Sequence, residues 1–362
     1  MRGLPGPFDR RRRRLLVALL ALPGIAGASV GYPDVRPRPL AFPGDGGAHP
    51  AFRIEWWYVT GWLRDAEARE YGFQITFFRN RPGIAEASAS RFAAKQLLFA
   101  HAALANPEWQ RLAYDQRAAR EGFGLAATKE GATDVHIGDW RLAQAGDAYT
   151  ARVRARAFAL DLTLDARAPP LVQGDGGVSR KGPDPANASF YYSRPQLAVA
   201  GHLAIGRRAR GVTGIGWLDH EWSSSYLPRG AVGWDWIGIN FDDGGALMAF
   251  RIRDARGGSL WAGGALRNPQ GSVRALEPAE VAFVPLRRWR SPRTGVEYPV
   301  SFRVHATDID ITLEPLFPDQ ELDAREGVGA VYWEGAVRAI RSGRATGRGY
   351  LELTGYGAPL RL

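Results

Sequence analysis

Three ionisable residues stand side by side between two tryptophans in the segment GIGWLDHEWSSS, residues 214–225. They are Asp219, His220 and Glu221, and they could perform acid–base chemistry on an apolar substrate. A carboxyl group that burial keeps protonated can donate a proton. Aromatic faces can stabilise a developing positive charge. The segment therefore predicts either an acid–base site or a set of buried charges that only stabilise the fold.

A β-strand over residues 211–222 would sort these side chains onto two faces, because successive strand residues point in opposite directions. One face would carry Trp217, Asp219 and Glu221, and the other Leu218, His220 and Trp222. Asp219 and Glu221, which share a face with Trp217, are therefore candidate catalytic residues. His220 is included as a candidate catalytic residue across the strand, facing the second domain.

The same alternation argues against a metal site at residues 219–221. Adjacent strand side chains diverge, so they cannot converge on one ion without a β-bulge. The sequence also contains no HExxH, P-loop, GxGxxG or GxSxG motif. A serine nucleophile within residues 223–225 is not favoured, because no base is placed to activate it. We predict neither a metal nor a cofactor.

Two further acids lie in tryptophan-rich segments, Glu55 in IEWWYVTGWL and Asp235 in GWDWIGIN. We predict that both are structural and pair with arginines such as Arg79 and Arg251, since buried carboxylates need such partners. The same structural role stays open for the acids at 219 and 221. The predicted ligand-binding residues are aromatic: Trp217, Trp222, Tyr192, Trp57, Trp234 and Trp236.

The elements that must position these residues are β-strands. The chain has 362 residues with 44 Gly and 24 Pro, which indicates many turns, and its 12 Trp, 12 Tyr and 16 Phe favour strands. Apolar residues alternate with a period of two, and no amphipathic helix of three turns is evident. Residues 107–128 are the most irregular. The predicted strands are residues 54–63, 71–79, 96–105, 149–164, 196–205 and 211–222.

The second half of the chain repeats the first. GWDWIGINFDDGGALMAFRIR (233–253) has the layout of residues 53–79, so that Asp235 falls where Glu55 sits, and GRGYLELTGYG (347–357) matches GVTGIGWLDHE (211–221). Duplicated units of about eight antiparallel strands predict two tandem barrels, each able to enclose one small ligand. The fold class is therefore all-β. We divide the chain into a signal peptide (1–28), an extended lead-in (29–50), an N-terminal barrel (51–228) and a C-terminal barrel (229–362).

The N-terminus predicts export. Residues 10–14 are a basic run, 15–22 a short apolar core, and 26–28 an A-x-A cleavage site. The apolar core is too short to span a bilayer, and the arginines before it also suggest twin-arginine export. The chain has no cysteine, which excludes disulfides and a lipidated cysteine. We predict a soluble periplasmic protein that has no lipid anchor and does not span the membrane after cleavage.

The net charge of +10 does not predict a nucleic-acid partner. Six Arg and one Asp in residues 1–28 carry +5 of it, and the remaining arginines are scattered rather than clustered. The expected partner is a hydrophobic small molecule, an isoprenoid or a lipid.

Five segments resemble, in the right order over roughly residues 42–357, the lipocalin-like family that includes carotenoid 1,2-hydratases: FPGDGGAHPAFRIEWWYVTGWL, ASFYYSRPQLAVAGHL, GIGWLDHEWSSS, GWDWIGINFDDGGALMAFRIR, and VYWEGAV with GRGYLELTGY. The branch concerned is usually labelled a predicted secreted hydrolase, a label that no motif in this chain supports. The resemblance implies two tandem lipocalin-like barrels and an association with ABC-type exporters of the lipoprotein-release kind.

The resemblance also implies a chemistry. Carotenoid 1,2-hydratases add water across the terminal double bond of acyclic carotenoids without a cofactor, using an acid in the strand that matches WLDHE. On this match Asp219 is the acid that donates the proton, Glu221 is the residue that orients water, and Trp217 is the neighbouring aromatic residue. The hydratases carry a His and a Trp upstream, where this chain has Phe190, Tyr191 and Tyr192.

Three functions remain open at this point: a cofactor-free hydro-lyase of the carotenoid 1,2-hydratase type, a non-catalytic lipid carrier working with an ABC-type exporter, and an interaction protein. Catalysis predicts that Asp219 faces an apolar cavity. An interaction protein predicts that Asp219 is sealed against an arginine or an indole. A carrier predicts a cavity without a poised acid.

Overall fold

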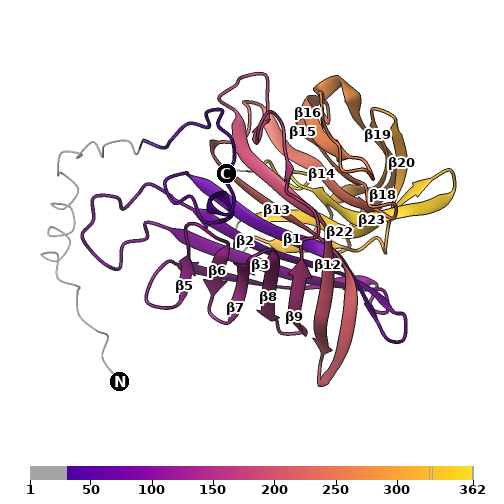
Figure 1. Cartoon of the computed structure of the whole chain (residues 1–362), viewed down its shortest axis with the longest axis horizontal. Coiled ribbons are helices and arrows are strands. Elements are labelled where there is room, and N and C mark those ends of the chain that lie inside the picture. Colours follow the sequence, from indigo (N-terminus) through magenta and orange to yellow (C-terminus); the bar gives the residue numbers. More distant parts are fainter. Residues whose placement is uncertain (1–30, 326, 328, 361–362) are drawn as a thin grey trace, which may run out of the picture. The chain divides into compact units, whose positions relative to one another are not determined.

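The computed structural model describes residues 31–325, 327 and 329–360, so the predicted signal peptide lies outside the described part. No α-helix occurs among the described residues; two short 3₁₀ turns, Gly44–Gly46 and Pro278–Glu280, accompany the strands. All strands lie within the compact unit Tyr32–Leu362, and they build two antiparallel sheets (Figure 1). None of the described helical segments is long and apolar enough to cross a membrane.

The first sheet has 13 strands in the order β4-β3-β2-β1-β13-β12-β9-β8-β7-β6-β5, with β10 and β11 added beside β12. Its strands are β1 (Ile54–Asp65), β2 (Glu70–Asn80), β3 (Leu97–Asn106), β4 (Arg111–Arg120), β5 (Ala126–Thr128), β6 (Asp134–Ile137), β7 (Trp140–Ala145), β8 (Ala148–Arg154), β9 (Phe158–Asp165), β10 (Leu171–Val172), β11 (Val178–Arg180), β12 (Ala188–Ile205) and β13 (Arg208–Ser225).

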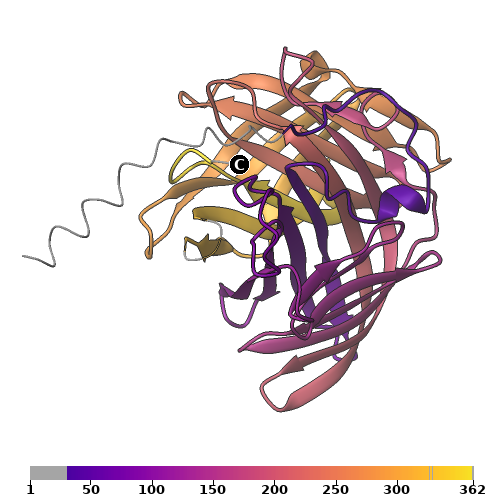
Figure 2. The same cartoon turned by 90° about the vertical axis from the view of Figure 1, so that its left-hand side faces the viewer.

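The second sheet has 10 strands in the order β17-β16-β15-β14-β23-β22-β20-β19-β18, with β21 added beside β22. Its strands are β14 (Ala231–Phe241), β15 (Ala246–Asp254), β16 (Ser259–Arg267), β17 (Val273–Leu276), β18 (Val281–Arg290), β19 (Glu297–Ala306), β20 (Ile309–Pro315), β21 (Glu321–Ala324), β22 (Ala330–Arg341) and β23 (Arg344–Leu353). Figure 2 shows the two groups of strands, indigo to pink and orange to yellow, from a second direction.

The two sheets repeat one topology, as the internal similarity of the sequence predicts. In each sheet the first four strands run outward as a meander, and the first strand pairs on its other side with the last strand of the unit, β13 or β23. Glu55 on β1 lies opposite Arg79 on β2, and Asp235 on β14 lies opposite Arg251 on β15. The all-β fold of two tandem lipocalin-like barrels is thus confirmed.

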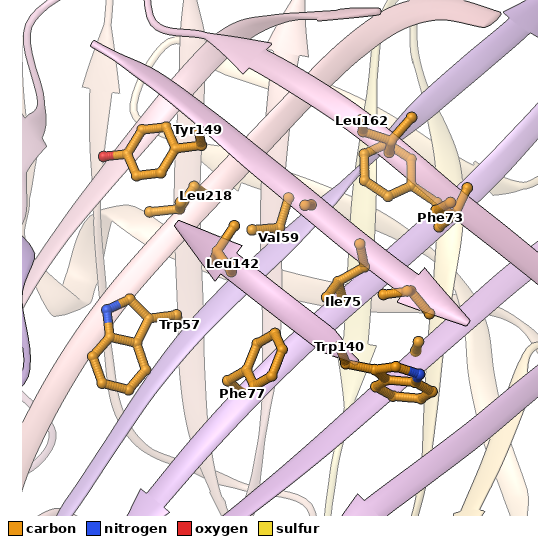
Figure 3. Packing of buried hydrophobic residues seen from close by; sticks show 14 of the residues in the cluster. Trp57, Val59, Phe73, Ile75, Phe77, Trp140, Leu142, Tyr149, Leu162 and Leu218 are labelled. Carbon is orange, nitrogen blue, oxygen red and sulfur yellow. The ribbon is translucent and has the colours of Figure 1, made fainter. Parts of the chain in front are cut away.

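The interior of the first sheet is packed with large apolar side chains, as Figure 3 shows for Trp57, Ile75 and Trp140 among others. The sheet curls until Arg117 on β4 reaches the opposite edge, where it donates hydrogen bonds to the carbonyls of Ile137 (3.1 Å) and Arg154 (3.2 Å). The side chains on the other face of β1 and β13 point away from this core, and we call this side the outer face of the first sheet.

That outer face packs against the second sheet. Tyr58 and Trp217 of the first sheet belong to one buried cluster with Trp236 and Tyr350 of the second. Hydrogen bonds connect the sheets as well: the Trp62 indole donates to the Gly349 carbonyl at 3.0 Å. The contact between the sheets is therefore an apolar layer with specific polar contacts.

Two expectations about local structure were wrong. Residues 149–164 form a hairpin of β8 and β9 rather than one strand, because Ala155 to Ala157 turn the chain between them. The region expected to be irregular, residues 107–128, contains the ten-residue strand β4. Its residues Arg111–Arg120 are mostly polar or alanine, so hydrophobic alternation gave no signal, and pairing with β3 forms the strand.

Candidate active site

A cavity of about 360 Å³ lies between the two sheets. Its size falls within the range of small-molecule sites, roughly 300 Å³ and above. β1, β2, β3 and β13 supply one wall, and β14, β15, β22 and β23 supply much of the other. The lining is mainly apolar and aromatic, and includes Trp56, Tyr58, Tyr191, Tyr226, Trp234 and Trp236. Five carboxyl groups and two cations interrupt this surface: Asp219, Glu221, Glu334, Glu352 and Lys181, together with the ion pair of Glu55 and Arg79.

Strand alternation on β13 brings both acids of the WLDHE segment to this cavity. Asp219 and Glu221 line it, and Trp217 belongs to the apolar cluster on the same face. Leu218 and Trp222 lie in the packed interior of the first sheet. The expectation that His220 faces the second domain was wrong, since its ring stacks on Trp57 inside the first sheet.

Asp219 is buried and held by three neutral donors. Its Oδ1 accepts hydrogen bonds from the Ser193 hydroxyl (2.5 Å) and the Trp217 indole (2.7 Å), and its Oδ2 accepts one from the Tyr191 hydroxyl (2.7 Å). Burial raises the pKa of Asp219 to about 7, and the nearby Glu221 adds to the increase, while the three donors oppose it. Asp219 is thus a carboxyl group that still holds a proton near neutral pH.

Glu221 differs from Asp219 because it has a cation as a partner. The Lys181 ammonium lies 2.7 Å from Glu221 Oε1, and the Ser189 hydroxyl donates to the same oxygen. Burial raises the pKa of Glu221, and contact with Lys181 opposes this. Burial also lowers the pKa of Lys181. The two neighbouring acids therefore have different environments, one with neutral donors and one with an ion pair.

The second sheet contributes another pair of acids, Glu334 on β22 and Glu352 on β23. They lie directly opposite each other across the two strands. Burial raises the pKa of Glu352 to about 8, and burial together with the charge of Glu352 raises the pKa of Glu334. The Trp234 indole donates to Glu352 at 3.2 Å.

The predicted structural acids are both paired with arginine. Glu55 Oε2 lies 2.8 Å from Arg79, and both side chains are fully buried. In the second sheet, Asp235 contacts Arg251 (2.6 Å) and Arg253 (2.9 Å), and it accepts a hydrogen bond from the Tyr356 hydroxyl.

Glu55 also contacts the imidazole rings of two histidines. Its Oε1 lies 2.8 Å from His49 Nδ1 and 2.9 Å from His220 Nε2. His49, Glu55 and His220 thus offer three possible metal-ligand atoms within 4.8 Å of one another. A search for a metal site at residues 219–221 alone does not identify this group. Glu55 Oε1 contacts both imidazole rings, and Glu55 Oε2 accepts a hydrogen bond from Arg79. The four side chains therefore form one connected hydrogen-bond network.

Four of the six predicted ligand-binding residues do not line the cavity, and one of them, Trp217, lies in the apolar cluster between the sheets. Trp57, Tyr192 and Trp222 are buried in the core of the first sheet, where Trp222 stacks on His49 with ring centroids 3.7 Å apart. Trp234 and Trp236 do line the cavity.

Gly238 lets the tryptophans next to the acids approach closely. A Cβ atom there would lie 2.6 Å from the Trp236 ring and 3.0 Å from the Trp217 ring. Trp236 in turn donates to the Tyr191 hydroxyl at 2.9 Å, so both indoles support the hydrogen bonds around Asp219.

The sequence reasoning missed Lys181, Tyr191 and Glu352. Lys181 directly follows the short strand β11. Tyr191 lies opposite Glu221 on β12, and Glu352 lies on β23, the counterpart of β13. The duplication was the signal that could have identified Glu352.

The raised pKa of Asp219 predicts a specific effect of pH on stability. An unfolded aspartate releases its proton near pH 3.8 and Asp219 near pH 7, so the neutral carboxyl contributes stability below this window. That contribution is lost as pH rises from about 4 to about 7, because the unfolded state ionises first. Asp219→Asn removes this titration, so we expect its Tm, relative to that of the wild type, to rise over the window. Calorimetry of both proteins across this range tests it, and a Tm difference independent of pH would contradict it.

A family model described as AttH-like matches residues 33–356 of the chain. The chain belongs to the AttH-like family. No curated protein matches it. A crystal structure of an AttH-type protein from Nitrosomonas europaea is 48% identical, covers 90% of this chain and 99% of its own, and superimposes with a TM-score of 0.83.

More distant structures share the fold of this AttH-like protein. Kievitone hydratase from Nectria haematococca is 14% identical with a TM-score of 0.69, over 91% of this chain and 97% of its own. CghA is 12% identical with a TM-score of 0.55, and the match covers 91% of this chain and 96% of CghA. The lipocalin-like fold is thus shared with a hydratase, while the finer relation to carotenoid 1,2-hydratases stays a prediction.

Proposed function

We propose that this AttH-like protein binds an apolar, unsaturated small molecule between its two sheets and hydrates it without a cofactor. The proposal depends chiefly on Asp219, a carboxyl group with a pKa of about 7 that lines a mainly apolar cavity. Acids such as Glu55 and Asp235 are neutralised by arginine, whereas Asp219 has only neutral donors among the described residues. One of these donors is the Trp217 indole, as the interaction-protein alternative predicts, but Asp219 also lines the cavity, as catalysis predicts.

The substrate class follows from the lining of the cavity. Tryptophan and tyrosine side chains together with other apolar side chains form much of it, which suits an isoprenoid or another lipid with isolated double bonds. A cavity of about 360 Å³ accommodates a small isoprenoid or one end of a long one. The relation to a hydratase fold is consistent with this class, and the acyclic carotenoids implied by the sequence resemblance are the first substrates to test.

In the proposed reaction, protonated Asp219 transfers its proton to one alkene carbon, and a carbocation forms at the other. The faces of the neighbouring aromatic residues stabilise this cation. A water molecule then adds to the cation and gives a proton to Glu221, which contact with Lys181 favours as the ionised base. Proton return from Glu221 to Asp219 through water restores the site, and the net change is alkene plus water to alcohol.

Ligand binding is tested by native mass spectrometry and solvent extraction of the protein isolated from the periplasmic fraction. We expect an apolar molecule to accompany the wild type. Leu97→Trp with Phe99→Trp, two partly exposed positions of the lining, should reduce its amount severalfold, because the new indoles occupy the cavity. Leu286→Trp, at an exposed position of the second sheet, is the matched control and should retain it. Equal ligand content in the blocked and control variants would contradict binding at this site.

A carrier without catalysis is the alternative, in which the extracted ligand is never altered. The periplasmic location and the ABC-type export partner remain predictions from the sequence.

A further inference from the structure

Glu334 is buried and Glu352 partly buried, and among the described residues no cation pairs with either acid. They face each other on adjacent strands, a position in which like charges destabilise a sheet. Among the described residues neither forms an ion pair, whereas Glu221 in the same cavity has Lys181. The raised pKa of both groups is the expected consequence of this missing neutralisation.

Polar atoms of this pair are incompletely hydrogen-bonded. Glu334 Oε1 and the Tyr58 hydroxyl are buried, and neither makes a hydrogen bond of good geometry to another described residue, although the Tyr58 hydroxyl lies close enough to Glu334 to oppose the rise of its pKa. Both residues line the cavity, and Tyr58 is only 5% exposed. Buried polar groups are normally hydrogen-bonded, and a neutral hydroxyl does not offset a carboxylate charge, so the two acids are open to a cationic partner.

One ammonium group, that of Lys181, already lies in this cavity, and its surroundings consist of aromatic rings and a carboxylate. The Lys181 Nζ atom lies 4.3 Å from the Phe250 ring centroid and 4.9 Å from that of Tyr191, with Glu221 at 2.7 Å. Aromatic faces and a carboxylate are the usual environment for a buried ammonium. The wall that the second sheet supplies repeats this composition, with Trp234 donating to Glu352, but among the described residues no cation pairs with that acid.

We propose that Glu334 and Glu352 form a subsite for a cationic ammonium group on the ligand, next to the faces of Trp234 and Trp236. The ligand is then an amphiphile whose apolar, unsaturated part lies toward Asp219 and whose amine or quaternary ammonium lies between the two glutamates. This inference rests on the proposed role of the cavity as the ligand site, and it narrows the class of ligand.

The test compares two probes of equal chain length, dodecyltrimethylammonium and 1-dodecanol, by tryptophan fluorescence titration below the micellar concentration. We expect the wild type to bind the ammonium probe at least tenfold more tightly. Glu334→Gln with Glu352→Gln should abolish this preference and leave the dodecanol affinity unchanged. Glutamine matches the neutral carboxyl in shape, and Glu352→Gln alone provides a milder variant should the double variant fail to fold.

A control variant separates the outcomes. Glu314→Gln, at an exposed position on β20, should keep the preference. Equal affinity of the wild type for both probes would overturn the ammonium subsite while still supporting an apolar ligand cavity. If neither probe binds, both the subsite and the proposed function are overturned.

Discussion

Replacing Asp219 by asparagine is expected to reduce hydration of an acyclic, terminally unsaturated carotenoid about 10²–10⁴-fold, the usual contribution of a positioned general acid. Asparagine keeps the shape of the side chain but has no proton to give to carbon. The amide oxygen can still accept from the Trp217 indole, so the variant should fold and bind ligand. Chromatographic rates of water addition, measured with ligand affinity, provide the comparison.

Ser193→Ala is the matched control for this substitution. It removes one donor to Asp219 and leaves the acid in place, so the rate should fall far less than with asparagine. The account would be contradicted if Asp219→Asn retained wild-type turnover. Loss of turnover together with unfolding would instead support a purely structural role for this acid.

Replacing Glu55 by alanine should cause the largest loss of stability. It leaves Arg79 buried without its carboxylate and removes the common partner of His49 and His220. Removal of one member of a buried ion pair typically costs about 3–5 kcal/mol of unfolding free energy. Chemical denaturation of the folded variant, followed by tryptophan fluorescence, measures this loss.

Asp134→Ala is a suitable comparison because it breaks an ion pair of good geometry in a more exposed place. Arg141 contacts both oxygens of Asp134 at 2.8 Å, and the arginine side chain is 56% exposed. Such pairs contribute about 1 kcal/mol or less. If Glu55→Ala cost no more than this control, the structural interpretation of Glu55 would be wrong.

The fold could be predicted from the sequence because its signals are local and repeated. Period-two alternation marked the strands around 54–63 and 211–222, and the similarity of 233–253 to 53–79 indicated the second barrel. The strand β4 was missed because its mostly polar and alanine residues give no such alternation.

The candidate site could be predicted only in part. Alternation placed Asp219 and Glu221 on one face, but both faces of β13 are apolar and buried, so the sequence did not specify which face meets the second sheet. That ambiguity explains the wrong orientation of His220. Lys181 reaches Glu221 only because β11 pairs with β12, a long-range contact with no local pattern.

The most direct measurement is the identity of the ligand bound to wild type and Asp219→Asn when both are purified in parallel and analysed by mass spectrometry. The account predicts a water adduct of an unsaturated molecule on the wild type and the unhydrated precursor on the variant. The same unaltered ligand on both proteins would contradict catalysis at Asp219 and identify the protein as a carrier.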